Sequence, residues 1–360
     1  MRHAHHHESQ ASHMIQALKG LFGLGRRAST TAGAIIAREA PEFVAVDGSR
    51  LDFRDPIDME DGLPHVDWEA VRAWCDGFDD DERGGMAWLA CEHAWLLHLR
   101  DALGSGYRLF ESNVALLLTR QNDRAADLTL AFVARTGRRV QRLLGRLAHV
   151  EPWGRDILIL FDDADTYYRY VGAFHPEDED FAASSGMFIS AGCAHFVSVD
   201  QDLHAVEPVI VHEMSHAMVT HLPLPTWLNE GIAVNAEHRL AGDGATVWDR
   251  RELVRRHRAF WTPPLIQGFW SGQSYLRPDE GNELSYDLGR IIVDAMSSDW
   301  TRFEDFALAA QRSDGGKAAA REVLGVDLGA FVASFLGAGD ADAWRPRPEC
   351  WTQPPEKGGF

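Results

Sequence analysis

The sequence has few cysteines and few lysines, and both shortages narrow what the protein can be. Its 360 residues include only four cysteines, Cys75, Cys91, Cys193 and Cys350, and no two of them form a CxxC pair. A cysteine-held zinc knot and a disulfide framework are therefore not expected, and a reducing, cytoplasmic compartment fits best. Nearly all basic residues are arginine, which we attribute to codon usage and not to a site.

Long apolar runs and an excess of positive charge are also missing. No stretch of 18 apolar residues occurs, so we expect no transmembrane helix and no integral membrane segment. The 54 acidic residues exceed the 35 basic ones, which gives a formal net charge of −19. Such a surface repels phosphate backbones, so nucleic acid is not an expected partner. The 45% of hydrophobic residues suffices for a large core and excludes wholesale disorder.

Composition and apolar periodicity divide the chain into five parts. The first 14 residues look like an expression tag, so their five histidines are set aside from metal arguments. Apolar residues at three- and four-residue steps predict helices, whereas short β-rich runs predict strands. The five parts are a tag and flexible N-terminus (1–40), a hairpin and helical N-terminal subdomain (41–106), a core (107–240), a mainly helical C-terminal subdomain (241–336) and an irregular tail (337–360).

The core is predicted to alternate strands and helices and then to end in two consecutive helices. Pro208 suits the first turn of the first of these helices, because no backbone N–H is needed there. This order favours an α+β fold in which a small sheet packs on that helix. The predicted core elements are strands at 112–120, 156–161, 186–190 and 194–199, and helices at 123–147, 164–170, about 207–221 and about 226–240.

Outside the core, the sequence predicts one hairpin and a series of helices. The hairpin turns at Asp47-Gly48, a pair typical of tight β-turns. The remaining predictions are an acidic connector up to His65, helices within 67–103, and C-terminal helices at about 247–260, 283–298, 301–312, 317–324 and 327–336.

The strongest chemical signal is the motif HExxH, which spans His212, Glu213 and His216. Histidines at positions i and i+4 lie one turn apart on one helix face, so both imidazoles can reach a single Zn²⁺. Glu213 lies beside that face, where it can hold a metal-bound water and accept its proton. The flanking residues are largely apolar, which indicates a buried helix whose polar side chains need a partner such as a metal.

A catalytic zinc site usually has three protein ligands, and Glu230 is the predicted third. The first helix rises about five residues past His216, roughly 7.5 Å, before prolines end it. An antiparallel helix from Thr226 then descends four residues, about 6 Å, to Glu230. Because the two displacements nearly cancel, Glu230 returns to the level of His216. Glu237, two turns further on, is the alternative ligand.

The motif HEMSH, the short proline-bearing loop after it and PTWLNEGIA (225–233) together resemble the gluzincins. The 13 residues between His216 and Glu230 are most similar to the compact peptidase MA-like family, over about residues 107–336. This resemblance implies a zincin-like catalytic domain, in which a small mixed sheet lies over the active-site helix. It also implies a peptide or protein substrate.

By the same resemblance, Zn²⁺ is held by His212, His216 and Glu230, and Glu213 is the general base and acid. Gluzincins often place an acid four residues after the metal-binding Glu to orient a ligand histidine, but Val234 stands there in this chain. Asn235 or another group is therefore expected to orient the histidines.

The resemblance also points to Tyr286 as the side chain that stabilises the oxyanion. Tyr286 lies at the start of a predicted apolar helix, from which its phenol can extend to a developing negative charge. The alternative is a core tyrosine whose hydroxyl is bonded elsewhere. Tyr275 and His257 are weaker candidates for the same role.

Together these observations predict a zinc-dependent hydrolase, specifically a metallopeptidase. Two other hypotheses remain open, a zinc-stabilised binding module without catalysis and an effector-type protease with one protein partner, the latter suggested by the extra helices at 67–105. The strands predicted at 186–190 and 194–199 are candidates to pair with an extended substrate, or are simply structural. The sequence leaves the substrate, the cleavage preference and the oligomeric state open.

Overall fold

The computed structural model describes residues 33–150, 153–174, 186–189, 191–200, 203–242 and 249–351. Within these residues the chain has a mixed α/β fold with mostly helical content. The predicted tag, and all else before residue 33, lies outside the described residues. Among the helices described, none combines the length and apolar character that a bilayer crossing requires.

The core strands form a six-stranded mixed sheet, in the order β1-β6-β7-β8-β10-β9. Its strands are β1 (Ala34–Ile36), β6 (Arg108–Glu111), β7 (Ala115–Thr119), β8 (Asp156–Phe161), β9 (Gly186–Ile189) and β10 (His195–Val199). The central strands β7, β8 and β10 run parallel, and the outer pairings are antiparallel. β7 is buried along its whole length, as expected for a strand with helices on both faces.

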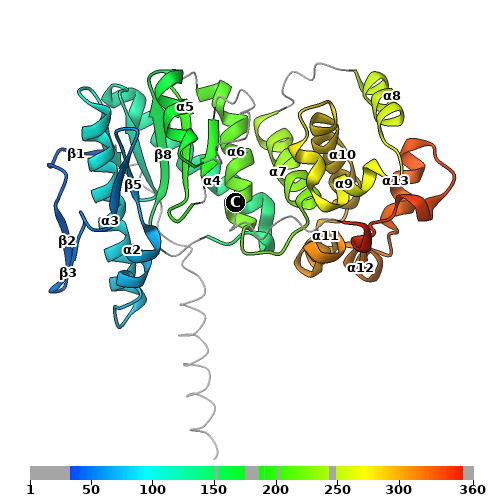
Figure 1. The fold of residues 1–360 in the computed structure, drawn as a ribbon, viewed down its shortest axis with the longest axis horizontal. Coiled ribbons are helices and arrows are strands. Elements are labelled where there is room, and N and C mark those ends of the chain that lie inside the picture. The colour runs from blue at the N-terminus through cyan, green and yellow to red at the C-terminus, as the bar shows by residue number, and fades with distance from the viewer. Residues whose placement is uncertain are drawn as a thin grey trace, which may run out of the picture. The chain divides into compact units, whose positions relative to one another are not determined.

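Helices cover both faces of this sheet, so two hydrophobic cores form (Figure 1). Side chains alternate along β7, with Ala115 and Leu117 in one core and Leu116 and Leu118 in the other. The first core also contains residues of α4 (Asp123–Leu144) and α6 (Leu203–Val219). The second contains residues of α2 (Trp68–Cys75), α3 (Asp81–Leu103) and α5 (Ala164–Gly172).

The N-terminal part holds two hairpins where the sequence predicted one. The predicted hairpin is confirmed as β2 (Phe43–Val46) and β3 (Ser49–Asp52). The predicted connector up to His65 is wrong, because β4 (Ile57–Glu60) and β5 (Leu63–Val66) pair there. Their turn uses Asp61 and Gly62, both at positive φ, and so repeats the Asp-Gly signal of the first hairpin.

Two other expectations for the first hundred residues can be compared with the structure. The predicted flexible segment up to residue 40 is wrong at β1, because Ala34–Ile36 pair with β6. The predicted helices within 67–103 are confirmed as α2 and α3, which are capped by Asp67 and Asp80. Both helices share the second core with sheet residues, so the part before residue 106 packs directly on the sheet.

The described C-terminal helices agree with the predicted ones and add one more. The added helix, α9, has Pro264 before it and Gly272 after it, and three of its seven residues are buried. The helices are α7 (Thr226–Ala241), α8 (Arg250–Phe260), α9 (Leu265–Ser271), α10 (Gly281–Met296), α11 (Trp300–Ala309), α12 (Lys317–Ala319), the π-helix η4 (Ala320–Leu324) and α13 (Leu328–Leu336).

The tail packs against the preceding helices as far as residue 351. Short 3₁₀ turns form at Ala341–Trp344 and Pro348–Cys350. Trp344 is buried, and its carbonyl accepts a hydrogen bond of 2.8 Å from Trp270 Nε1. The expected irregular tail thus contains no α-helix or strand up to residue 351, and it packs against α9.

Helix α6 begins earlier than predicted. It starts at Leu203, so Pro208 lies inside the helix, not in its first turn. A proline there removes one backbone donor from the helix, a cost that packing of the surrounding apolar residues has to offset. The helix ends at Val219, where the N–H of Leu222 turns back onto the Val219 carbonyl.

Candidate metal centre

The candidate site is built on α6 and α7, which lie side by side (Figure 1). Apolar residues such as Val211 and Met214 anchor α6 in the first core. After α6 ends, the chain reverses, and α7 begins at Thr226 with Pro225 as its N-cap. Since Pro225 lacks a backbone donor and is itself buried, it suits the start of a helix inside the protein.

This reversal brings together the three predicted ligands. His212 Nε2 lies 3.0 Å from His216 Nε2, and Glu230 Oε2 lies 3.4 Å from the first nitrogen and 3.3 Å from the second. In the described part of the chain, these three residues are the one His/Cys/Asp/Glu group whose ligand atoms converge closely enough for a metal ion. The predicted return of Glu230 to the level of His216 is therefore confirmed.

The spacing of these three atoms matches the coordination of zinc. In a tetrahedral site with ligand bonds of about 2.05 Å, neighbouring ligand atoms lie about 3.3 Å apart. The observed separations are 3.0, 3.3 and 3.4 Å. Moreover, Glu230 Oε2 is buried and, among the described residues, has no hydrogen-bond partner, although two imidazole nitrogens lie this close. Burying a carboxylate oxygen without a hydrogen bond costs free energy, and a positive charge on the two imidazoles, carried by a proton or by a metal ion, offsets that cost.

The outer nitrogen of each histidine faces an acceptor, which leaves the inner nitrogen available to bind a metal ion. His216 Nδ1 lies 3.1 Å from Asn229 Oδ1, and His212 Nδ1 lies 3.4 Å from Glu237 Oε2. Both oxygens accept, so each Nδ1 carries the hydrogen and each Nε2 directs its lone pair into the cluster. Glu237, the alternative ligand, thus lies behind His212 and not beside the other ligands.

Asn235 does not orient either histidine, contrary to the expectation from the sequence. Its Nδ2 donates to the carbonyl oxygens of Gly231 and Arg290 and so joins α7 to α10. The residues that orient the histidines are Asn229 and Glu237, which the sequence analysis did not assign to this role. In the sequence, the sign of this role for Asn229 was its place directly before the predicted ligand Glu230.

Protonation of the cluster is set by competition between burial and charge. Burial disfavours the charged form of His212, but Glu230 and Glu237 outweigh it and raise the pKa of His212 to about 10. Burial likewise opposes ionisation of Glu230, yet the two imidazoles lower the pKa of Glu230 to about 2. The carboxylate therefore stays ionised deep in the protein, next to bases that have a high affinity for a positive charge.

Glu213 and Tyr286 lie close to the three ligands. Burial raises the pKa of Glu213, and the neighbouring carboxylates act in the same direction, while His212 and His216 oppose them. The ring of Tyr286 lies 6.4 Å from the ring of His212, measured between centroids. Burial, together with Glu230 and Glu213, raises the pKa of Tyr286, so its hydroxyl remains a hydrogen-bond donor at neutral pH.

Two glycines allow Tyr286 to approach the ligands. A Cβ atom on Gly231 would lie 2.6 Å from the Gly289 carbonyl oxygen, and one on Gly289 would lie 2.9 Å from the Trp227 carbonyl oxygen. Main chain therefore contacts main chain where α7 crosses α10. Gly231 follows Glu230 directly, and Gly289 lies three residues after Tyr286, so this crossing sets the distance between the ligand and the tyrosine.

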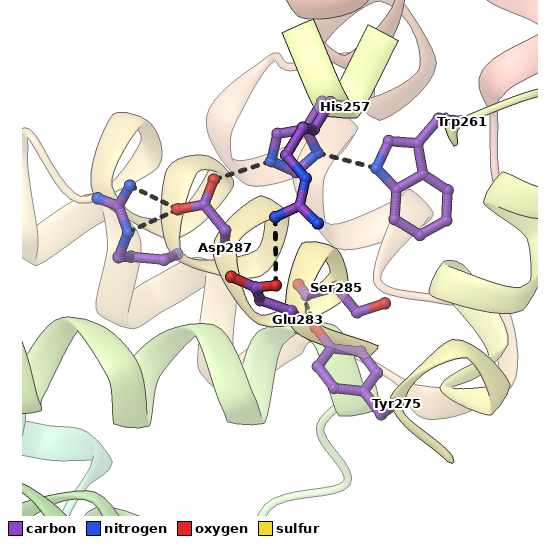
Figure 2. A network of polar contacts seen from close by, with 8 residues as sticks. His257, Trp261, Tyr275, Glu283, Ser285 and Asp287 are labelled. Carbon is purple, nitrogen blue, oxygen red and sulfur yellow. Dashed lines mark hydrogen bonds and ion pairs between the residues drawn. The ribbon is translucent and has the colours of Figure 1, made fainter. Parts of the chain in front are cut away.

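The two weaker candidates have structural contacts instead. Tyr275 is buried, its hydroxyl donates to the Ser285 carbonyl at 3.0 Å, and its ring packs edge-on against Tyr286 with centroids 5.0 Å apart. It therefore supports Tyr286 and does not replace it. Figure 2 shows His257 between Asp287 and Trp261.

Both ring nitrogens of His257 are already engaged in that network. Trp261 Nε1 donates to His257 Nδ1 at 2.9 Å, so Nε2 carries the hydrogen and donates to Asp287 Oδ2 at 2.8 Å (Figure 2). Burial alone would raise the pKa of Asp287, but hydrogen bonds from His257 and Arg290 outweigh it and lower the pKa. His257 therefore joins α8 to α10 and does not belong to the cluster around Glu230.

Comparisons with known proteins do not indicate a function, so a functional argument has to rest on the geometry of the cluster around Glu230. No protein-family model matches the chain, and neither the curated proteins nor the solved structures searched contain a match.

Proposed function

We propose that the protein is a zinc-dependent hydrolase, specifically a metallopeptidase of the gluzincin type with a zincin-like catalytic domain. The observation that carries the proposal is the triangle of 3.0, 3.3 and 3.4 Å between His212 Nε2, His216 Nε2 and Glu230 Oε2. Two imidazole nitrogens and one carboxylate oxygen at this spacing are a donor set used by catalytic zinc sites.

The number of ligands favours catalysis over a purely structural metal. Within the described ranges, no fourth His, Cys, Asp or Glu joins the group of three. A metal-stabilised binding module needs a further ligand that closes the site. Glu237 is the nearest additional carboxylate, but it contacts Nδ1 of His212, on the outer side of that ring. Three ligands leave one tetrahedral position for water or substrate.

The surrounding residues have the properties that peptide hydrolysis requires. Zn²⁺ held by the three ligands would supply an activated water and polarise the scissile carbonyl. Glu213 accepts the proton of the attacking water and later donates it to the leaving amine, a task that suits a carboxyl group whose pKa burial raises. Tyr286 donates its hydroxyl hydrogen to the oxygen that becomes negatively charged.

The sheet offers a place for the substrate backbone. β9 is the edge strand next to β10, and it contacts α6, which carries His212 and His216. An extended peptide can pair with such an edge through main-chain hydrogen bonds. Of the two strands considered from the sequence, β9 is the last in the described strand order, whereas β10 is paired on both sides.

Two glutamine variants test the proposal. Glu230→Gln removes the anionic ligand, so zinc content and hydrolysis of a peptide library should both fall to background. Glu213→Gln leaves all three ligands, so zinc content should equal that of the parent chain while hydrolysis falls at least about 100-fold. Zinc is measured by elemental analysis after dialysis, and cleavage by mass spectrometry.

The control is Glu322→Gln, which changes an exposed glutamate of η4 and should leave both readouts unchanged. Because every variant keeps the same N-terminal histidines, their zinc contributes equally and cancels in the comparison. Unchanged hydrolysis in zinc-loaded Glu213→Gln would refute the assigned base. Equal zinc content in Glu230→Gln and the parent would refute the metal site itself.

A further inference from the structure

Two contacts hold α10 on either side of Tyr286. Ser285 Oγ lies 2.6 Å from Ser274 Oγ, which belongs to the 3₁₀ turn before α10. On the other side, His257 Nε2 of α8 donates to Asp287 Oδ2 at 2.8 Å (Figure 2). Successive residues of an α-helix point about 100° apart, so the side chains at 285 and 287 leave α10 in nearly opposite directions. The direction of Tyr286, which lies between them, is therefore fixed from both sides.

His257 provides the buried link between α8 and α10. Its side chain has no exposed surface, and that of Asp287 is 14% exposed. Arg290 also pairs with Asp287, at 2.8 Å, but both residues belong to α10, so this pair cannot hold α10 against a neighbour. Arg256 of α8 pairs with two glutamates at the start of α10, whose side chains are 46% and 54% exposed, and water screens such pairs. Among these contacts, the one that water screens least is made by His257.

The ring of His257 is itself fixed by its neighbours. Trp261 Nε1 donates to Nδ1 at 2.9 Å, which leaves the hydrogen on Nε2, and Phe335 packs edge-on against the ring with centroids 5.2 Å apart. Replacing a buried polar network by well-packed apolar side chains often costs no stability. Hydrogen bonds, however, depend on direction, so a fully paired network specifies one arrangement of the helices that carry it.

The rotation of α10 matters because it sets where the Tyr286 hydroxyl lies. Gly231 and Gly289 determine how closely α7 and α10 approach, but a contact at one crossing point does not prevent α10 from turning about its own axis. A side-chain tip about 6 Å from a helix axis moves about 1 Å when the helix turns by about 10°. A displacement of about 1 Å in an active site can lower a rate about 100-fold.

We infer that His257 is a positioning residue for Tyr286. Through Asp287 it fixes the rotation of α10 and so keeps the phenol hydroxyl near the metal ligands, where it donates to the developing oxyanion. His257 does not touch the substrate itself. The inference rests on the proposed hydrolase function for its effect on rate, whereas the effect on the position of Tyr286 can be measured without turnover.

Kinetics of the full chain with a peptide cleaved in the library digest test the effect on rate. His257→Leu removes the link, so kcat should fall about tenfold while KM and zinc content stay unchanged. His257→Gln can still donate to Asp287 and should recover most of the loss. In a Tyr286→Phe background, His257→Leu should have no further effect, because no hydroxyl is left to position. An equal loss of kcat in both backgrounds would overturn the inference.

His195 is the matched control. It is also buried, and both of its ring nitrogens are engaged, with the Cys193 carbonyl and the Tyr170 hydroxyl, each at 2.8 Å. These partners belong to the second core, on the other face of the sheet. His195→Leu should lower the unfolding temperature about as much as His257→Leu but leave kcat unchanged. A similar loss of kcat in both variants would show that destabilisation, and not positioning, lowers the rate.

A spectroscopic measurement separates this inference from the proposed function. In protein labelled with 3-fluorotyrosine, the fluorine resonance of Tyr286 is the one that Tyr286→Phe removes. His257→Leu should shift or split that resonance, and Trp261→Phe, which frees Nδ1 but keeps an aromatic ring, should do so if the first variant does not fold. His195→Leu should leave it in place. An unmoved resonance would overturn the inference even if the parent hydrolyses peptides, whereas a shifted resonance without hydrolysis by the parent would support the positioning and refute the proposed function alone.

Discussion

Two buried glutamates on opposite faces of the same sheet behave in opposite ways. Glu92 on α3 accepts hydrogen bonds from Trp88 Nε1 at 2.7 Å and from the Arg155 N–H at 3.1 Å, and burial raises its pKa to about 8. Glu230 on α7 is kept ionised by two imidazoles, which lower its pKa to about 2. Burial alone neutralises a carboxyl group, so the charged one marks the side of the sheet where chemistry is expected.

The largest expected difference between the two glutamates is in metal affinity. Glu230→Gln removes an anionic ligand, so we expect zinc affinity to fall about 1,000-fold, or roughly 4 kcal/mol. Glu92→Gln, on the other face, should leave zinc affinity unchanged. Competition with a chromogenic chelator measures both constants, and a similar loss in both variants would remove the distinction between the two sites.

The next difference is in the pH dependence of stability. The pKa of Glu92 is about 8 in the folded protein, against 4.5 for an ordinary glutamate, so the folded state holds the extra proton between these values. The stability that depends on this proton is fully present below pH 4.5 and is lost as the pH rises through about 8. Relative to Glu92→Gln, the parent should lose on the order of a few kcal/mol between pH 5 and 9.

Urea unfolding of the parent and of Glu92→Gln at several pH values measures this difference. Because all other titrating groups are common to both chains, the change in their stability difference isolates Glu92. Parallel stability curves would show that Glu92 is ionised in the folded protein at neutral pH.

A smaller effect is expected where α7 crosses α10. Gly231→Ala places a methyl group 2.6 Å from the Gly289 carbonyl oxygen, so the helices must separate, at a cost of about 2 kcal/mol. The matched control is Gly172→Ala in α5, where an added Cβ meets nothing within 4 Å. That change should be neutral or stabilise the fold by up to about 1 kcal/mol. Thermal unfolding measures both, and equal effects would show that the crossing tolerates a side chain.

The smallest expected effect concerns the residue behind His212. Glu237→Gln keeps a hydrogen-bond acceptor at Nδ1 but removes its charge, so zinc affinity should fall about tenfold. The same chelator competition measures it, with Glu322→Gln as the exposed control. An unchanged affinity would mean that Glu237 does not orient the ligand.

Much of the site could be predicted because it depends on local geometry. The i, i+4 spacing fixes His212 and His216 on one helix face, and the rise per residue on either side of the proline loop fixes the level of Glu230. The Asp-Gly turn of the first hairpin is local in the same sense. The second hairpin carried the same signal at Asp61-Gly62, so its omission was an error of interpretation and not a lack of information.

What the sequence did not predict depends on contacts between distant segments. Asn235 was expected to orient a histidine, but the approach of α10 draws its side chain to the Arg290 carbonyl. Likewise, the packing of the tail involves Trp270, which donates to the Trp344 carbonyl 74 residues away in the chain. The crossing of α7 and α10 could not be predicted either, because in the sequence it appears only as two distant glycines, Gly231 and Gly289. Tertiary packing of this kind has no periodic pattern to read.

The contact between Gly231 and Gly289 has a consequence for how this site can be redesigned. Since backbone touches backbone there, the main chain itself limits how far apart Glu230 and Tyr286 can lie. A library that varies the residues lining the substrate path can therefore explore new specificities without altering that limit, provided that both glycines are held constant.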